Sequence, residues 1–283
     1  MNPRILVLGA DGQLGREIQR LYTIKNFEFI FVNRQSLDIT NYSGLLASVD
    51  GLKPDWIINC AAFTNVDRAE IEKDACWAAN AQGPRNIAMI CSSKKIRLIH
   101  ISTDSVFASE NYLFNKISDV TNPINEYSRA KVAGERAIIE NSNSDYWIIR
   151  TAWLYGKDGK NFVSAILGKL QMNKPFHVVD DQFGQPTWTQ NVVHAIFGIL
   201  ESVMNPGILH IATPSVTSRL EWARTIAEIF NYDVSLILPT KSTQNKGVAI
   251  RPKYSLIEPS KIEGIRNDWL IPPKVSLSHF FAS

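Results

Sequence analysis

Short apolar runs alternate with longer stretches of helical periodicity over the first 150 residues of this 283-residue chain. The runs are apolar on both sides, as in the strands of a parallel sheet that is covered on both faces. They occupy residues 5–8, 27–32, 56–59, 98–102 and 147–150. The clearest helical stretches occupy residues 13–23, 74–93 and 125–141. Each helix can supply the right-handed crossover between parallel strands, so the pattern predicts an α/β fold with a doubly wound parallel sheet.

The rhythm changes after Arg150 to loops, helices and proline-rich segments near Pro239, Pro252 and Pro272. We therefore expect a first domain over residues 1–150 and a smaller C-terminal domain over residues 151–283. In doubly wound folds the late chain often crosses back to the sheet, so part of the second half is expected to rejoin the first. The sequence has no internal repeat and no low-complexity linker.

The composition is that of an average globular protein, with 45% hydrophobic and 20% charged residues. The formal net charge of +3 is spread without a long basic run, so neither nucleic acid nor a membrane is an implied partner. No apolar run approaches the roughly 18–20 residues of a membrane helix, and we expect a cytoplasmic protein. Cys60, Cys76 and Cys91 lack the paired spacing of a zinc site and are expected to be reduced, mostly buried thiols.

A glycine-rich turn follows the first predicted strand and opens the first predicted helix. It reads Gly9-Ala10-Asp11-Gly12-Gln13-Leu14-Gly15. The glycines permit a tight turn and let the backbone approach a pyrophosphate, which would lie on the unpaired N–H groups of the helix N-terminus. The context favours a dinucleotide-binding Rossmann domain over residues 1–150; the alternative is a merely structural turn.

The end of the second predicted strand bears on the choice between NADPH and NADH. An acidic residue there would bind the ribose 2′-hydroxyl of NADH, but this strand ends Val32-Asn33-Arg34. An arginine suits a 2′-phosphate, so we expect NADPH and leave NADH open. The alternative is that Arg34 is simply exposed or stacks on adenine.

Tyr127 and Lys131 are four residues apart at the start of a predicted helix, so both side chains lie on one helix face. Such a pair is common by chance. Here a hydroxyl segment, Ser102-Thr103-Asp104, follows the fourth predicted strand, at the carboxyl edge where open parallel sheets bind ligands. The three motifs in this order resemble the extended short-chain dehydrogenases/reductases.

Longer stretches are similar to the dTDP-4-dehydrorhamnose reductase family. They are residues 54–70, Arg150-Thr151-Ala152-Trp153-Leu154-Tyr155-Gly156, Asn161-Phe162 and Asp181-Gln182-Phe183-Gly184-Gln185-Pro186-Thr187. The resemblance runs from Arg4 to about Pro252, and the segment from Asp181 to Thr187 is far more specific than the glycines. It implies that residues 151–283 mainly bind substrate.

The resemblance also implies roles for individual residues. The turn from Gly9 to Gly15 would hold the pyrophosphate, and the cofactor would further contact Asn33, Arg34, Asp38, Ile39, Ala61, Ala62, Thr64, Asn80, Ser102, Tyr127 and Lys131. The sugar would contact Thr103, Asp104, Ser105 and Trp153. From the residues alone, Trp153 could equally be a core residue, and Asp38 and Asn80 ordinary polar groups of a loop and a helix.

The chain departs from the family pattern on the sugar side of the expected site. Ser105 stands where the family has tyrosine after Ser-Thr-Asp, and Ser128 and Ala130 replace the usual Gly and Ser/Thr between Tyr127 and Lys131. The loop from residue 108 to residue 120 lacks the family's Asp-Gly and Pro-Tyr-x-Glu pieces. Hydride chemistry survives these changes, whereas the identity of the deoxysugar and the C4 stereochemistry stay open.

The expected reaction is NAD(P)H-dependent reduction of a 4-keto-6-deoxy sugar nucleotide, dTDP-4-dehydrorhamnose to dTDP-rhamnose, for cell-surface polysaccharide precursors. Tyr127 would donate the proton to the carbonyl oxygen and Thr103 would orient that carbonyl. Lys131, as an adjacent cation helped by an oxidised nicotinamide, is expected to stabilise the phenolate of Tyr127; a lowering of its pKa by about 3 units would be about 4 kcal/mol.

Two other functions stay open at this point. One is a nucleotide-binding regulatory subunit like the beta subunit of methionine adenosyltransferase, and the other is a sugar-nucleotide epimerase or dehydratase. Family analogy suggests a homodimer and Mg²⁺ near acidic side chains such as Glu70 and Glu72, which on a helix are more simply explained as exposed charge. No metal ligand is assigned.

Overall fold

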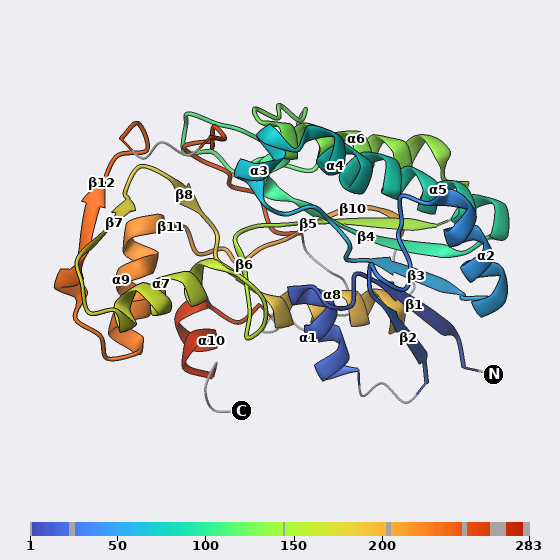
Figure 1. Cartoon of the computed structure of the whole chain (residues 1–283), viewed down its shortest axis with the longest axis horizontal. Helices are drawn as coiled ribbons and strands as arrows, with labels where there is room; N and C mark the ends of the chain where they lie inside the picture. The colour runs from blue at the N-terminus through green and yellow to red at the C-terminus, as the bar shows by residue number, and fades with distance from the viewer. Residues whose placement is uncertain are drawn as a thin grey trace.

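The computed structural model describes residues 2–22, 26–143, 145–201, 205–244, 248–260 and 270–279. Within these ranges the chain forms a six-stranded parallel sheet in the order β10-β5-β4-β3-β1-β2 (Figure 1). Its strands are β1 (Arg4–Leu8), β2 (Glu28–Val32), β3 (Trp56–Asn59), β4 (Arg97–Thr103), β5 (Tyr146–Thr151) and β10 (Gly207–Ile211). The strand order reverses between β1 and β3, which is where ligands bind in such sheets.

Helices cover both faces of the sheet because its strands alternate two sets of apolar side chains. Ile5 and Val7 of β1 pack on one face with α1 (Gln13–Leu21) and α8 (Thr189–Glu201). Leu6 and Leu8 pack on the other face with α2 (Tyr42–Leu52), α5 (Gly83–Lys94) and α6 (Glu126–Asn141). The predicted doubly wound α/β sheet is therefore confirmed (Figure 1). No helix in the described ranges is both long enough and apolar enough to cross a membrane.

A second apolar cluster lies beyond the carboxyl edge of the sheet (Figure 1). It is built by α7 (Phe162–Gln171), β7 (Phe176–Val179), α9 (Arg219–Ile229), β12 (Ile237–Thr240) and α10 (Pro273–His279). Short pairs connect this region: β6 (Leu154–Tyr155) with β9 (Thr187–Trp188), and β8 (Phe183–Gly184) with β11 (Thr217–Ser218). Between them α8 and β10 return to the sheet. The division of the chain at residue 150 stays a prediction.

The helix predicted over residues 74–93 is wrong as a single element. The structure has α4 (Lys73–Trp77), a π-helical turn η1 (Ala78–Gln82) and then α5; α3 (Val66–Ile71) comes before them. Pro84 stands in the first turn of α5, where its missing N–H breaks the regular hydrogen-bond ladder. Gly134 of α6 lies against this turn, since a Cβ there would come within 2.2 Å of the Asn80 carbonyl oxygen. The wide turn therefore sets the place of Asn80.

Candidate active site

The glycine turn holds the backbone where side chains would not fit. Gly9 has φ +76°, and a Cβ on it would come within 2.6 Å of the Ala61 nitrogen. A Cβ on Gly15 would come within 2.5 Å of the Gly9 carbonyl oxygen. The N-cap of α1 is Gly12, which has no side chain to occupy the N–H groups of the first turn. This helix end is therefore free to receive an anionic group.

A cavity of about 490 Å³ opens over this turn. It collects many of the residues predicted to bind the cofactor, namely Gly9, Asp11, Gly12, Asn33, Arg34, Asp38, Ile39, Ala61 and Ala62. Leu14 packs in the core instead, and Gly15 lies against the backbone of the turn. Gln13 does not line this cavity; it packs against Gly159, where a Cβ would come within 3.2 Å of the Gln13 Cβ.

The wall of this cavity around Asn33, Arg34 and Asp38 is polar and is held by its own hydrogen bonds. Asn33 donates from Nδ2 to Oδ2 of Asp11 at 2.8 Å. The backbone N–H of Thr40 donates to Asp38 at 2.9 Å and holds the pKa of that carboxyl below its ordinary value, helped by Arg34 at 3.6 Å. The Arg34 side chain is 81% exposed, so its guanidinium is free to meet a ligand at the rim.

Asn80 stands behind the loop that forms the opposite wall. Its side chain is 1% exposed, and its amide accepts from the Phe63 N–H at 2.8 Å and donates to the Phe63 carbonyl at 2.9 Å. Both amide groups are thus used in fixing the loop from Ala61 to Thr64. Asn80 acts on the cavity through Phe63.

A smaller cavity of about 170 Å³ lies at the carboxyl end of β4. It brings together predicted residues from four separate stretches of the chain, namely Thr64, Thr103, Asp104, Ser105, Tyr127 and Trp153. Thr103 donates from Oγ1 to Asp104 at 3.0 Å, and Tyr127 lines the same cavity. A proton-carrying phenol and a threonine hydroxyl thus face one small space.

Trp153 is held in this cavity by a backbone that a tryptophan rarely adopts, with φ +39°. Gly184 makes room for its ring, because a Cβ there would come within 2.1 Å of Trp153 Cε2. The guanidinium carbon of Arg219 lies over the Trp153 ring, 3.6 Å from its centroid. Local strain at a cavity wall is typical of functional sites.

The protonation of Tyr127 in the protein alone is governed by burial. Burial raises its pKa to about 12, the hydrogen bond with Thr103 opposes this, and the Asp104 charge adds to the rise. Lys131 is not among the groups that act on this pKa in the protein alone, so the lowering expected with an oxidised nicotinamide beside it stays a prediction. The amino group of Lys131 is engaged elsewhere, donating to the Ile101 carbonyl at 2.7 Å and lying 3.3 Å from His100 Nε2.

Two other buried groups complete the electrostatics. Burial lowers the pKa of Lys131 to about 8 and raises that of Asp104 to about 6. Ser102 is not brought into either cavity: its hydroxyl donates to Glu135, which pairs with Arg150 at 2.7 Å in the interior. The side chain of Ser102 therefore serves the core.

Comparison with known proteins identifies the family of the chain. The profile described as RmlD substrate binding domain matches residues 3–280. The chain belongs to this family. A dTDP-4-keto-6-deoxy-D-glucose reductase from Streptomyces niveus is 36% identical over 257 residues, which are 91% of this chain and 89% of that protein. A dTDP-4-dehydrorhamnose reductase from Mycolicibacterium smegmatis is 37% identical over 91% of this chain and 78% of its own length.

Solved structures of the family agree with the fold. A dTDP-4-dehydrorhamnose reductase from Bacillus anthracis, in complex with NADP, matches with a TM-score of 0.93 and 33% identity over 100% of this chain and 99% of its own. A dTDP-4-dehydrorhamnose reductase from Clostridium acetobutylicum has the same TM-score and 35% identity, over 99% and 98% of the two chains.

Several residues at the site were not predicted from the sequence. Arg219 and Arg251 line both the 170 Å³ cavity and an adjoining one of about 930 Å³. Arg251 pairs with Asp67 at 2.7 Å, while burial lowers the pKa of Arg219 to about 10, opposed by Asp104. Gln182 also lines both cavities, and it lies in the segment from Asp181 to Thr187 that the sequence analysis singled out. Nothing local in the sequence distinguishes Arg219 from any other arginine at the start of a helix.

No group of three or more His, Cys, Asp or Glu side chains within the described ranges is arranged to hold a metal ion. Glu70 accepts from the backbone N–H of Glu126 at 2.8 Å, and Glu72 pairs with Arg68. The three cysteines are free, with Cys76 and Cys91 buried and Cys60 half-buried, as expected.

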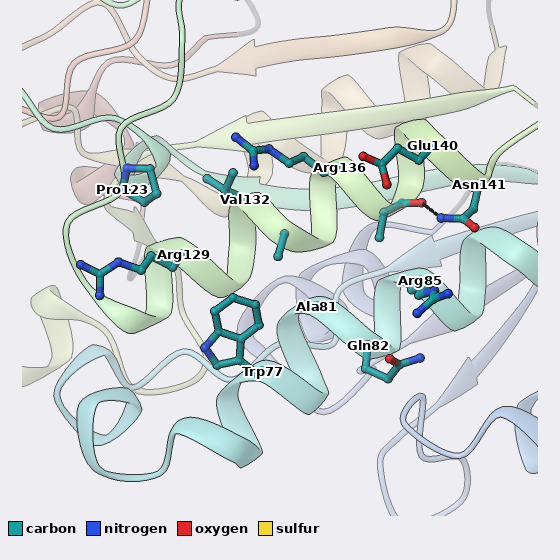
Figure 2. Close-up of a pocket in the computed structure, with 12 residues that line it drawn as sticks. Trp77, Ala81, Gln82, Arg85, Pro123, Arg129, Val132, Arg136, Glu140 and Asn141 are labelled. Carbon is teal, nitrogen blue, oxygen red and sulfur yellow. Dashed lines mark hydrogen bonds between the residues drawn. The ribbon is translucent and has the colours of Figure 1, made fainter.

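A groove of about 760 Å³ lies apart from these cavities, between the π turn with α5 and the length of α6 (Figure 2). Trp77 and Arg85 line it from one side, and Arg129 and Arg136 from the other. None of the residues predicted for the site lines this groove. It belongs to a different surface from the candidate active site.

Proposed function

We propose that this chain reduces the 4-keto group of a dTDP-linked 6-deoxy sugar, dTDP-4-dehydrorhamnose, with NADPH. The names of its relatives, dTDP-4-keto-6-deoxy-D-glucose reductase and dTDP-4-dehydrorhamnose reductase, support the substrate class. The NADP bound to the Bacillus anthracis relative supports the choice of cofactor.

The observation that carries the proposal is that one loop lines three adjoining cavities. Cys60, Ala61, Ala62 and Phe63 line the cavity over the glycine turn. Thr64 and Val66 line both the 170 Å³ cavity that contains Tyr127 and the adjoining cavity of about 930 Å³. A dinucleotide, a sugar and a nucleoside diphosphate would thus meet end to end, with the sugar in the middle.

The chain's own residues fit the glycine cavity to a dinucleotide and the middle cavity to a ketone. NADPH held over the glycine turn would supply the hydride. Tyr127 would donate its phenol proton to the oxygen that gains charge, and Thr103 would hydrogen bond to the same oxygen. Lys131 lines neither of these two cavities, and it would hold the nicotinamide ribose only by turning its amino group away from the Ile101 carbonyl.

The large cavity suits the nucleoside diphosphate. Its cationic groups are Lys160, Lys169, Arg219 and Arg251. Arg219 lies where this cavity meets the sugar cavity, and its planar guanidinium matches the oxygens of a phosphate group. Phe162 supplies an apolar wall, with its ring 4.9 Å from the Arg219 guanidinium.

The proposal is tested by mixing the purified protein with NADPH and 4-keto sugar nucleotides while following the absorbance of the reduced cofactor. A reductase consumes NADPH in proportion to product. A regulatory subunit consumes none, and an epimerase or dehydratase converts the sugar without net oxidation. Either of the last two results would refute the proposal.

A further inference from the structure

Two buried side chains that the proposed reaction does not use connect the loop from Cys60 to Phe63, which lines the cavity over the glycine turn, to Lys131. Asn59 ends β3 and His100 lies beside it in β4, in direct register. Each is 1% exposed. Asn59 accepts from the Ala61 N–H at 3.1 Å, its amide nitrogen lies 3.0 Å from His100 Nδ1, and His100 Nε2 lies 3.3 Å from Lys131 Nζ.

This chain of contacts fixes the hydrogen on the imidazole. Because the Asn59 oxygen is occupied by the Ala61 N–H, the amide must present its NH₂ group to His100. Nδ1 of His100 then accepts a hydrogen bond, and the neutral ring carries its hydrogen on Nε2. A doubly protonated ring would set two donors against each other at Nδ1, and burial lowers the pKa of His100 well below its ordinary value.

The Nε2 hydrogen is aimed at the amino group of Lys131. An ammonium group has three donors and no acceptor, so it opposes this hydrogen, whereas a neutral amine accepts it with its lone pair. The other ionisable groups that act on Lys131 are Glu135 on α6, Cys76 on α4 and Cys60 after β3. The Glu135 carboxylate favours the charged lysine, whereas burial raises the pKa of Cys76 to about 11 and that of Cys60 to about 12, so both thiols are neutral where Lys131 titrates. Burial disfavours the ammonium form of Lys131. The Nε2 hydrogen of His100 acts in the same direction as burial.

We propose that His100 is a positioning residue: locked by Asn59 with its hydrogen on Nε2, it holds the amino group of Lys131 against the Ile101 carbonyl and disfavours its ammonium form. The inference rests on the proposed function only in that Lys131 matters there for hydride transfer. The tautomer and the titration of Lys131 are properties of the protein without substrate.

His210 is an internal comparison with the opposite assignment. It is also buried, but its Nδ1 lies 3.2 Å from the Glu258 carbonyl oxygen, which can only accept. Its hydrogen therefore lies on Nδ1, and Nε2 accepts from Arg150 Nη1 at 3.4 Å. One protein should thus hold two buried histidines in opposite tautomers.

The first experiment is ¹⁵N NMR of protein labelled at histidine, with His100→Gln and His210→Gln used to assign the signals. His100 should be the Nε2–H tautomer and His210 the Nδ1–H tautomer from pH 6 to pH 10. The His100 signals should shift as Lys131 titrates, and this shift should be absent in Lys131→Met. An Nδ1–H tautomer at His100, or an imidazolium at pH 6, would overturn the inference.

The second experiment reverses the tautomer with Asn59→Asp. A carboxylate there would accept from Nδ1–H, so Nε2 would turn its lone pair toward Lys131 and stabilise the ammonium form. The pH at which the Lys131-linked shift occurs should rise, on the order of one unit. The rise in Asn59→Asp/His100→Phe, measured against His100→Phe, should be smaller than the rise in Asn59→Asp measured against the wild type; an equal rise would assign the effect to the new charge alone and refute the role of His100. The NMR titration is read without substrate, so failure of the reductase assay would not be mistaken for failure of this inference.

Discussion

The hydroxyl of Ser105 lies 2.9 Å from the hydroxyl of Ser128, so two positions at which the chain departs from its family pattern are in contact. Ser105 follows the Thr103-Asp104 segment and lines the 170 Å³ cavity that contains Tyr127, while Ser128 is fully buried in the first turn of α6. The two departures therefore act as one change: a smaller residue on the sugar side and a hydroxyl that satisfies it.

We expect Ser105 and Ser128 to be energetically coupled. Because each hydroxyl is the other's partner, Ser105→Ala and Ser128→Ala should together cost less than the sum of the single changes, with a coupling of about 0.5–1.5 kcal/mol. Urea unfolding of the four proteins of a double-mutant cycle measures it. Ser105→Ala combined with Ser164→Ala on α7 serves as the uncoupled control. Strict additivity for the first pair would show that the contact contributes nothing.

The central sheet could be predicted because burial on both faces leaves a signature within each strand. β3 is predicted to the residue, and β4 and β5 differ only at their ends. The helix pattern failed at Asn80, because a π turn is stabilised by distant contacts with Phe63 and Gly134. Strand β10 was not predicted, since its pairing partner β5 lies more than 50 residues earlier.

Candidate site residues could be predicted from the sequence where they directly follow a strand or begin a helix. They could not be predicted where only the tertiary fold brings them to the site. Thr103 and Tyr127 stand out by position at a strand end and a helix start. Arg219 reaches the cavity only because α9 packs beyond the sheet edge, and His100 looks like any strand residue until Asn59 is placed beside it. The cofactor contact of Ser102 stays a prediction; alternation along β4 turns its hydroxyl to Glu135, which the sequence did not indicate.

Removal of one hydroxyl tests the proton donor. Tyr127→Phe should lower kcat by roughly 10² to 10⁴ and leave NADPH affinity nearly unchanged, because the glycine turn supplies most of the cofactor binding. With a pKa of about 12 the free-enzyme phenol keeps its proton well above neutral pH, so it should cause no loss of activity below pH 10. Tyr155→Phe, at a buried tyrosine outside the site, is the matched control. A Tyr127→Phe protein with near wild-type kcat would refute the acid role.

The buried amino group of Lys131 should make stability depend on pH. Its pKa is about 8 in the folded protein against an ordinary 10.5, so the unfolded chain binds more protons between these values. The free energy of unfolding should therefore rise with pH across this window relative to Lys131→Met, by about 3 kcal/mol in total. Chemical denaturation at pH 7.5 and pH 10.5 measures the difference. Lys73→Met, at a lysine 56% exposed, should show no such trend; a flat difference for Lys131→Met would contradict the prediction.

The rim arginine of the dinucleotide cavity tests the cofactor choice. Arg34→Ala should raise the KM for NADPH about tenfold, or about 1.4 kcal/mol, and leave the KM for NADH nearly unchanged, because only NADPH carries a 2′-phosphate. Arg16→Ala, in α1, is a control for loss of a nearby positive charge. An equal loss for both cofactors would remove the 2′-phosphate from the account and leave Arg34 as a partner of Asp38 or of adenine.

The position of Arg219 makes it the residue that should distinguish a nucleoside diphosphate sugar from a free sugar. Its guanidinium carbon lies over the Trp153 ring, 3.6 Å from the ring centroid, and Arg219 lines both the 170 Å³ cavity and the adjoining 930 Å³ cavity. A phosphate there would receive two parallel hydrogen bonds from a group whose plane is already fixed by the ring.

Arg219→Lys keeps the charge but loses the plane and the paired donors, so it should raise the KM for the sugar nucleotide by roughly tenfold, and Arg219→Ala by up to about a hundredfold, with kcat little changed. Steady-state kinetics at saturating NADPH measures both. Arg85→Lys, in the separate groove of Figure 2, is the matched control and should leave KM unchanged. If Arg219→Lys bound substrate as well as the wild type did, a point charge would suffice and the stacked geometry would have no part in recognition. If instead kcat fell while KM held, Arg219 would act on the ketone through Asp104, whose pKa it lowers, and the diphosphate would have to be bound by Arg251 and the two lysines.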